Sequence, residues 1–231
     1  MDDQATSRTG QGDRVRLFPL QGTLLLPGTF LPLNVFEPRY LQLVEDVMDD
    51  DRRIGMIQPY AAEGEAPTMA VIDPQRPPLY GVGCVGEVVE CERQVDGRYW
   101  VVLRGERRFR VVEELAPDAG GYRQVLADVS GFPNDPVELE KEIEIGHLLA
   151  AAERFCSARE LDFDLELVAA LVPAQAVNAL CAALPFGAAE KQALLEAAEP
   201  ESRCDLLTTL LEMQLSGSLE PSASYPPPTV N

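Results

Sequence analysis

Three glycines form the pattern in this sequence that comes nearest to a known chemical role. Gly81, Gly83 and Gly86 make a G-x-G-x-x-G string, which in some proteins holds the phosphates of a dinucleotide. That role requires a strand before the glycines and a helix after them, so that the phosphates meet the N-terminus of the helix. Here Pro77 and Pro78 precede the string, and the strand-like letters E-V-V-E-C-E follow it. We therefore interpret the glycines as permitting a bend or close packing between strands.

Other residue types that perform catalysis or bind metals are sparse and badly spaced for such work. His147 is the only histidine, and with no cysteine or second histidine nearby it is expected on a helix surface or half-buried. The run Asp49–Asp51 lacks the alternating ligands and central glycine of a calcium loop, so we interpret it as the solvated end of a helix. The sequence contains no G-x-x-x-x-G-K-[ST] string for an ATPase and no G-x-S-x-G string for a hydrolase. These features predict a protein that is not an enzyme and needs no cofactor or metal.

Composition restricts the compartment and the partners. The cysteines are odd in number, form no C-x-x-C pair and have apolar neighbours, so we expect them to be reduced and buried: Cys84, Cys91, Cys156, Cys181 and Cys204. The formal net charge of −19 argues against nucleic acid, which is bound through cations, and against an anionic membrane surface. No apolar run approaches the roughly 20 residues of a membrane span, and the polar, acidic start is no secretory signal. We therefore expect a cytoplasmic protein.

The first half of the chain is predicted to be mostly β, with one early helix. Prolines interrupt the apolar stretch Val15–Tyr40, so it should form short extended segments joined by turns. From Pro38 onward the apolar residues fall at helical spacing, which predicts a helix. Strands are expected at residues 53–58, 80–92, 98–104, 107–115 and 122–131, with a hairpin at Asp96-Gly97, a turn at Gly105-Glu106 and a mobile loop at 61–78. We expect the strands to close into a small twisted barrel, because closure removes exposed edges.

The second half is predicted to be a bundle of helices. Asp135 is expected to cap a helix that has Pro136 at its first position and continues to Ser157. Further helices are expected at residues 161–172, 173–184, 187–198 and 200–216, and in the 187–198 helix Lys191 should face outward. The predicted organisation is a disordered start at 1–13, a β-rich part at 14–133, a helical bundle at 134–216 and a disordered tail at 217–231.

Three strings in this chain occur in the same order in a known family. They are the stretch Val15–Tyr40, the letters V-V-L-R-G-E-R-R-F-R-V with Gly105, Arg108 and Val111 at intervals of three, and the letters from Leu184-Pro185 through E-K-Q-A-L-L-E to Arg203. Together they resemble the N-terminal domain of Lon proteases, and the resemblance covers about residues 14–216. It implies an α+β fold, in which a PUA-like small β-barrel or pseudobarrel with one early helix is followed by an α-helical bundle. In Lon this domain recognises and positions protein substrates and does no chemistry itself, and it also occurs as a free-standing protein.

The resemblance implies a non-enzymatic module that binds polypeptide, either unfolded segments or a partner protein such as a protease or its client. An extended peptide would lie against a sheet edge or in the groove between the two halves, anchored by apolar side chains. Candidate anchors are Phe30, Phe36 and Tyr80, which flank predicted loops but could each belong to the core instead. Arg108 belongs to a small basic cluster that either pairs with the abundant glutamates or docks an acidic peptide. A PUA-like module that binds RNA and an unrecognised hydrolase are the alternative functions.

Overall fold

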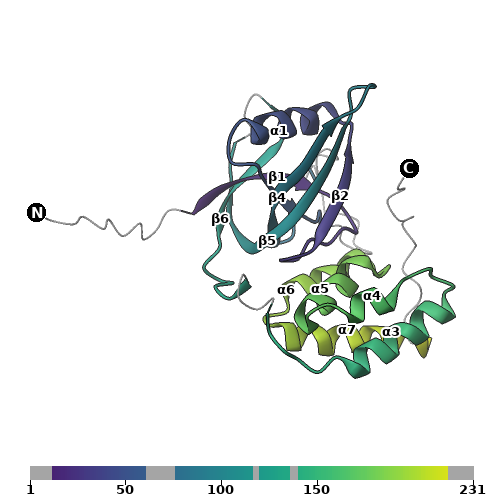
Figure 1. Ribbon diagram of the computed structural model, residues 1–231. Helices are drawn as coiled ribbons and strands as arrows, with labels where there is room; N and C mark the ends of the chain where they lie inside the picture. The colour runs from purple at the N-terminus through teal and green to yellow at the C-terminus, as the bar shows by residue number, and fades with distance from the viewer. Residues whose placement is uncertain (1–11, 61–75, 117–119, 136–139, 218–231) are drawn as a thin grey trace, which may run out of the picture.

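The computed structural model describes residues 12–60, 76–116, 120–135 and 140–217. Most of the two termini predicted to be disordered, most of the predicted mobile loop at 61–78 and the predicted helix start at Pro136 lie outside these residues. The described part is a mixed α+β structure with one six-stranded sheet and several helices (Figure 1). Among the described residues, no helix combines the length and the apolar character needed to cross a membrane.

Six strands form the sheet: β1 Asp13–Pro19, β2 Phe30–Val35, β3 Arg53–Ile57, β4 Val82–Arg93, β5 Tyr99–Glu114 and β6 Arg123–Asp128. Their order is β2-β5-β4-β3-β1-β6, and β5 pairs with β6 as well. The hydrogen-bonded pairings therefore run in a closed circuit through β5, β4, β3, β1 and β6, with β2 attached to β5 outside it. The pairing of β1 with β3 is parallel and the others are antiparallel. The predicted hairpin at Asp96-Gly97 is confirmed, and Gly97 has the positive φ of 87° that its turn requires.

The prediction of a turn at Gly105-Glu106 is wrong, because β5 continues through both residues as a single 16-residue strand. Its register against β4 shifts there, with Arg107 opposite Val85 and Gly105 opposite Gly86, so Glu106 is the extra residue of a bulge. Gly105 serves close packing instead of a turn: a Cβ at this position would lie 2.1 Å from the carbonyl oxygen of Leu26. A glycine that favours a turn in sequence can equally mark such an approach of two backbones.

Helix α1, Pro38–Met48, begins where the sequence predicts and lies above the strands in Figure 1. Helices α3 Gly146–Ala158, α4 Leu165–Ala169, α5 Pro173–Ala183, α6 Ala188–Glu196 and α7 Pro200–Leu215 form a bundle below the strands. The described residues 140–145 are not helical, so the predicted continuous helix up to Ser157 is wrong there. Its later part is α3 from Gly146, where the carboxylate of Glu144 accepts from the Gly146 N–H at 2.8 Å. The predicted 161–172 helix is shortened to α4. Asp164 caps α4, because its carboxylate accepts a hydrogen bond from the backbone N–H of Leu167.

Two clusters of buried residues hold the structure together. The smaller one fills the strand circuit and includes Leu17, Val85 and Phe109. The larger one is continuous from the strands and α1 into the bundle, and it contains residues as distant in sequence as Leu26 and Leu207. The two sequence halves therefore share one hydrophobic core.

Candidate functional site

One side of strands β2 and β5 gathers apolar side chains outside the core. Successive side chains of a strand point to opposite sides of the sheet. One side of this pair is buried in the core and carries Leu33, Val35, Val101 and Leu103. The other side carries residues that face one another across the two strands: Phe30, Pro32 and Asn34 from β2, and Arg104, Val102 and Trp100 from β5. We call the apolar members of this outward side, with Phe36 just beyond β2, the β2 face: Phe30, Pro32, Phe36, Trp100 and Val102.

The β2 face is open to solvent. Phe30 and Phe36 are each 62% exposed, and Trp100 and Val102 are half-buried. Exposed apolar side chains scattered singly are ordinary, but two phenylalanines, a tryptophan and a valine on one side of two paired strands form a patch of the kind that marks interaction sites. On the neighbouring strand β4, Glu92 lies opposite Trp100 and Glu90 lies opposite Val102, so the patch has an acidic border.

Strand β2 is also a sheet edge, since β5 is its one strand neighbour among the described residues. An edge strand offers backbone N–H and C=O groups to an extended peptide. Pro32 removes one of these donors, which limits uncontrolled pairing with other strands. The sequence prediction named Phe30 and Phe36 but missed Trp100 and Val102. The alternation in the letters R-Y-W-V-V-L-R could have placed these two on one side of their strand, but nothing in the sequence pairs that strand with β2.

Tyr80 is not part of the β2 face. It precedes β4, its ring meets the ring of Tyr60 edge-on at 5.2 Å between centroids, and its backbone N–H donates to the carbonyl of Gln58 at 3.0 Å. The buried side chain of Gln58 in turn donates to the carbonyl of Ala188 in α6 at 3.0 Å. Tyr80 therefore lies beside the junction between the strands and the bundle.

Arg108 is buried at that same junction, with 1% of its side chain exposed. Its Nε and Nη2 donate to Oδ1 of Asp135 at 3.0 and 2.6 Å. Its guanidinium also lies over the ring of Phe132, 4.3 Å from the ring centroid. Its remaining donors reach backbone carbonyls at the end of α6, those of Leu195 and Ala197 at 3.0 and 2.5 Å. Almost none of this side chain is exposed to a docked peptide, and its contacts join strand β5 to Asp135 and to the end of α6.

Arg203 binds the same segment from the bundle side. It is 2% exposed, and its Nη2 donates to the carbonyl of Ala197 at 3.2 Å, the same oxygen that Arg108 uses. Its Nη1 donates to Oδ1 of Asn178 at 2.8 Å, and the amide of Asn178 donates to the carbonyl of Pro27 at 3.0 Å. The two arginines of the sequence motifs therefore satisfy carbonyls left open at a helix end, and they fix the bundle against the strands.

The prediction that Lys191 faces outward is wrong. Its side chain is buried, and its ammonium donates to the carbonyl of Ala182 at 3.1 Å. Burial lowers the pKa of this ammonium below its ordinary value. The next residue, Gln192, is buried as well and donates to the carbonyl of Val82 on β4 at 3.2 Å. Helix α6 thus directs Lys191 toward α5 and Gln192 toward β4, and each donates to a backbone carbonyl that would otherwise be buried without a partner.

The described residues show little that could act as a nucleophile or metal ligand. Four of the five cysteines are buried, as predicted, and Cys91 is half-buried. Burial raises the pKa of the Cys84 thiol, and it raises that of Cys181 to about 12, so both thiols stay protonated and unreactive. His147 is exposed on α3. In the part of the chain that the structure describes, no group of three or more His, Cys, Asp or Glu side chains is placed to hold a metal ion.

Comparison with known proteins gives a consistent relationship. A family model described as the ATP-dependent protease La (LON) substrate-binding domain matches residues 14–213. A Lon protease of Parabacteroides distasonis is 28% identical over 210 residues, which are 88% of this chain and 24% of that protein. Lon protease 2 of Myxococcus xanthus is 30% identical over 207 residues, 84% of this chain and 23% of that protein. The chain therefore spans about a quarter of the length of these relatives.

Solved structures agree with the sequence relatives. A crystal structure of a Lon N-terminal domain protein from Xanthomonas campestris has a TM-score of 0.58 and 25% identity, and the match covers 85% of this chain and 98% of that one. The N-terminal domain of a Mycobacterium avium complex Lon protease shares the fold, with a TM-score of 0.55 and 17% identity over 87% of this chain and 98% of the other. The chain therefore belongs to the Lon substrate-binding domain family.

Proposed function

We propose that this chain is a non-enzymatic polypeptide-binding module, and that it holds extended or unfolded segments of other proteins on the β2 face. The observation that carries the proposal is the pair Phe30 and Phe36, each 62% exposed on the outward side of an edge strand, in a family described as substrate-binding. The partner is an unfolded polypeptide or a partner protein such as a protease or its client.

The chemistry of the β2 face suits such a ligand. Aromatic side chains supply large apolar contact areas, and an unfolded segment exposes the apolar residues that can cover them. Glu90 and Glu92 at the border favour clients in which lysine or arginine flanks the apolar residues. No ATP is required for this step, because binding uses only apolar burial, backbone hydrogen bonds and charge.

The remaining finer assignments are proposals as well. We propose that the closed circuit of five strands is a PUA-like pseudobarrel, which is supported by its pairing order. We also propose that the protein acts in the cytoplasm and binds neither nucleic acid nor membranes. The net charge of −19 supports this, since it repels polyanions.

Binding of a fluorescently labelled, permanently unfolded protein, measured by anisotropy, tests the proposal. Replacing Phe30 and Phe36 together by serine should weaken binding by at least about tenfold, because anchor residues of this kind contribute about 2 kcal/mol or more. Val112→Ser is the matched control, since Val112 is 64% exposed and lies outside the β2 face.

Equal binding by the wild type and the double variant would contradict the use of the β2 face. Absence of binding by the wild type would contradict the function itself.

Replacing Glu90 and Glu92 by glutamine should weaken binding of a basic client more than that of a neutral one, and the difference should shrink as salt is added.

A further inference from the structure

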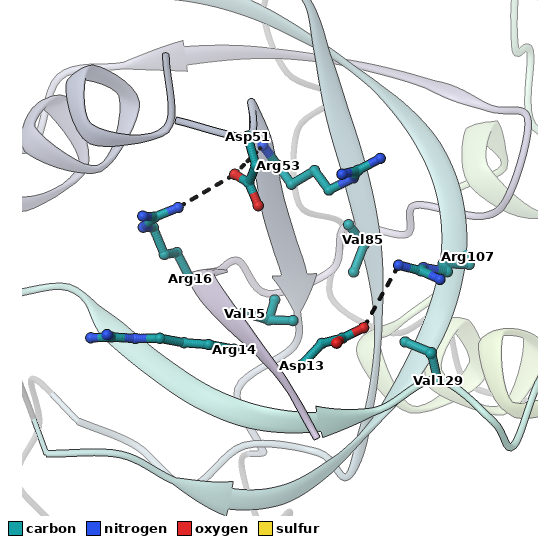
Figure 2. A pocket seen from close by; sticks show the side chains of 9 residues that line it. All are labelled: Asp13, Arg14, Val15, Arg16, Asp51, Arg53, Val85, Arg107 and Val129. Carbon is teal, nitrogen blue, oxygen red and sulfur yellow. Dashed lines mark hydrogen bonds and ion pairs between the residues drawn. The ribbon is translucent and has the colours of Figure 1, made fainter. Parts of the chain in front are cut away.

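A cavity of about 310 Å³ opens at one end of the strand circuit, where β1, β3, β4 and β5 approach one another (Figure 2). Its floor is apolar and consists of Val15, Val85 and Val129. Val15 and Val85 belong to the buried cluster inside the circuit, and Val129 packs against that cluster. The volume lies near the lower end of the roughly 300–1,000 Å³ that ligand sites occupy, which suits a small ligand or the last residue of a chain.

Arg107 supplies a cation on the same side of the cavity as these valines. It lies directly opposite Val85 in the pairing of β4 and β5, so both side chains leave the sheet on the same side. Its guanidinium is 3.8 Å from a carboxylate oxygen of Asp13, too far for a hydrogen bond, and the two side chains are 42% and 62% exposed. An exposed ion pair this long contributes little to stability, so a ligand can replace Asp13 at small cost.

Other arginines around the cavity add positive charge without competing for its ligand. Four arginines and two aspartates line it, a formal balance of +2 in a protein whose net charge is −19. Arg16 is held by Asp50 at 2.6 Å, Arg53 is held by Glu106 at 2.7 Å, and Arg14 donates to the side chain of Gln124, so all three guanidiniums are engaged within the protein. Figure 2 shows Arg16 on the far side of β1 from Arg107. Arg107 is thus the cation best placed above the apolar floor.

We propose that this cavity binds the C-terminal carboxylate of a client polypeptide, with Arg107 on the carboxylate and an apolar last side chain on the three valines. The proposal rests on the polypeptide-binding function proposed above and adds to it a preference for chain ends. A planar carboxylate with one negative charge matches the two-pronged geometry of a guanidinium. A free phosphate would leave the valines uncovered, and its charge of about −1.5 to −2 would be repelled more strongly by Asp13 and Asp51.

Two short labelled peptides that differ only at the C-terminus, a free acid and an amide after a final leucine, test the proposal by anisotropy. The acid should bind about tenfold more tightly, as expected for charge-assisted hydrogen bonds. Arg107→Gln should remove the difference between acid and amide while leaving the unfolding midpoint unchanged. Arg154→Gln is the matched control, because Arg154 on α3 also forms a long, exposed ion pair: its side chain is 61% exposed and lies 3.9 Å from Glu212. This variant should still bind the acid more tightly than the amide.

Each other outcome counts against the proposal in a distinguishable way. If acid and amide bind the wild type equally, and the Phe30 and Phe36 double variant weakens both, the preference for chain ends is refuted and the binding function remains. If neither peptide binds, both proposals fail together. If the acid and amide are equivalent but inorganic phosphate binds in an Arg107-dependent way, the cavity is a site for free anions instead.

Discussion

Arg108 shows how a charged residue can serve packing when all of its donors find acceptors. Its guanidinium is engaged by Asp135, by carbonyls at the end of α6 and by the ring of Phe132. Removing one partner of such a buried pair leaves the other charge without compensation. We expect Arg108→Met to lower the free energy of unfolding by about 3–5 kcal/mol, measured by urea denaturation.

The double variant with Arg108→Met and Asp135→Leu should cost less than Arg108→Met alone, because it leaves no unpaired buried carboxylate. Arg98→Gln is the control for loss of a surface arginine. Its ion pair with Asp96 is more than half exposed, so its removal should change stability by less than about 0.5 kcal/mol. A double variant that is less stable than the single one would show that Asp135 stabilises the fold apart from the ion pair, through its 2.6 Å contact to the backbone N–H of residue 108.

Lys191 gives the stability of this protein a predictable dependence on pH. Burial lowers the pKa of its ammonium below the ordinary 10.5, so in the window between the two values the unfolded chain binds more protons than the folded one. The contribution of Lys191 to stability therefore rises with pH through that window. We expect the unfolding free energy of the wild type, relative to that of Lys191→Met, to increase as the pH rises toward 10.5. A flat or falling difference in denaturation measurements would refute this.

At the scale of elements, the approach of β5 to the segment before β2 restricts residue size. A Cβ on Gly105 would lie 2.1 Å from the carbonyl oxygen of Leu26, and the backbones of Gly105 and Gly28 are joined by a 2.9 Å hydrogen bond. Gly105→Ala should therefore destabilise the protein by about 2–4 kcal/mol, because backbone must move. Gly81→Ala is the matched control, since a Cβ at Gly81 meets nothing within 4 Å, and it should change stability by less than about 0.5 kcal/mol.

Urea denaturation of the two glycine variants and the wild type provides the comparison. Similar effects at the two positions would mean that β5 can shift away from Leu26 without cost. In that case the bulge at Glu106 would be an adaptable feature of the sheet, and the close approach would not explain the glycine in the motif.

At the scale of the whole molecule, we propose that residues 14–216 fold as one unit. The large core cluster runs from the strands into the bundle, and Arg108, Asn178 and Gln192 bond across the junction. Cutting the chain between residues 133 and 134 would expose both sides of this core to water. We therefore expect the separate fragments 14–133 and 134–216 to lack cooperative unfolding, and the intact chain to unfold in a single transition.

The single tryptophan, Trp100, reports on the strands by fluorescence, while far-ultraviolet circular dichroism reports mainly on the helices. Coincident transitions by the two probes in the intact chain would confirm one cooperative unit. If two independent domains instead meet at residue 133, the isolated 14–133 fragment should unfold cooperatively. Its unfolding midpoint should then equal the midpoint that Trp100 fluorescence gives for the intact chain.

Much of the secondary structure could be predicted because its signals are local. Proline at the first helical position and apolar residues at helical spacing located α1, α5 and α7 close to their observed bounds. Alternation and Asp96-Gly97 located the hairpin of β4 and β5. The prediction of one continuous helix up to Ser157 failed at residues 140–145, which are not helical, and local spacing gave no sign of that break.

The sequence by itself determined the α+β class and the family, because these depend on composition, spacing and short strings, and it named Phe30 and Phe36 as candidates without deciding whether they are exposed. The tertiary structure alone decided which side chains share a surface. The pairing of β2 with β5 placed Trp100 beside those residues, the packing of α6 beside α5 buried Lys191, and the packing of the end of α6 against β5 buried Arg108. A side chain's burial depends on partners that can be more than 80 residues away, as Leu195 is from Arg108, and local spacing carries no information about which distant segment will arrive.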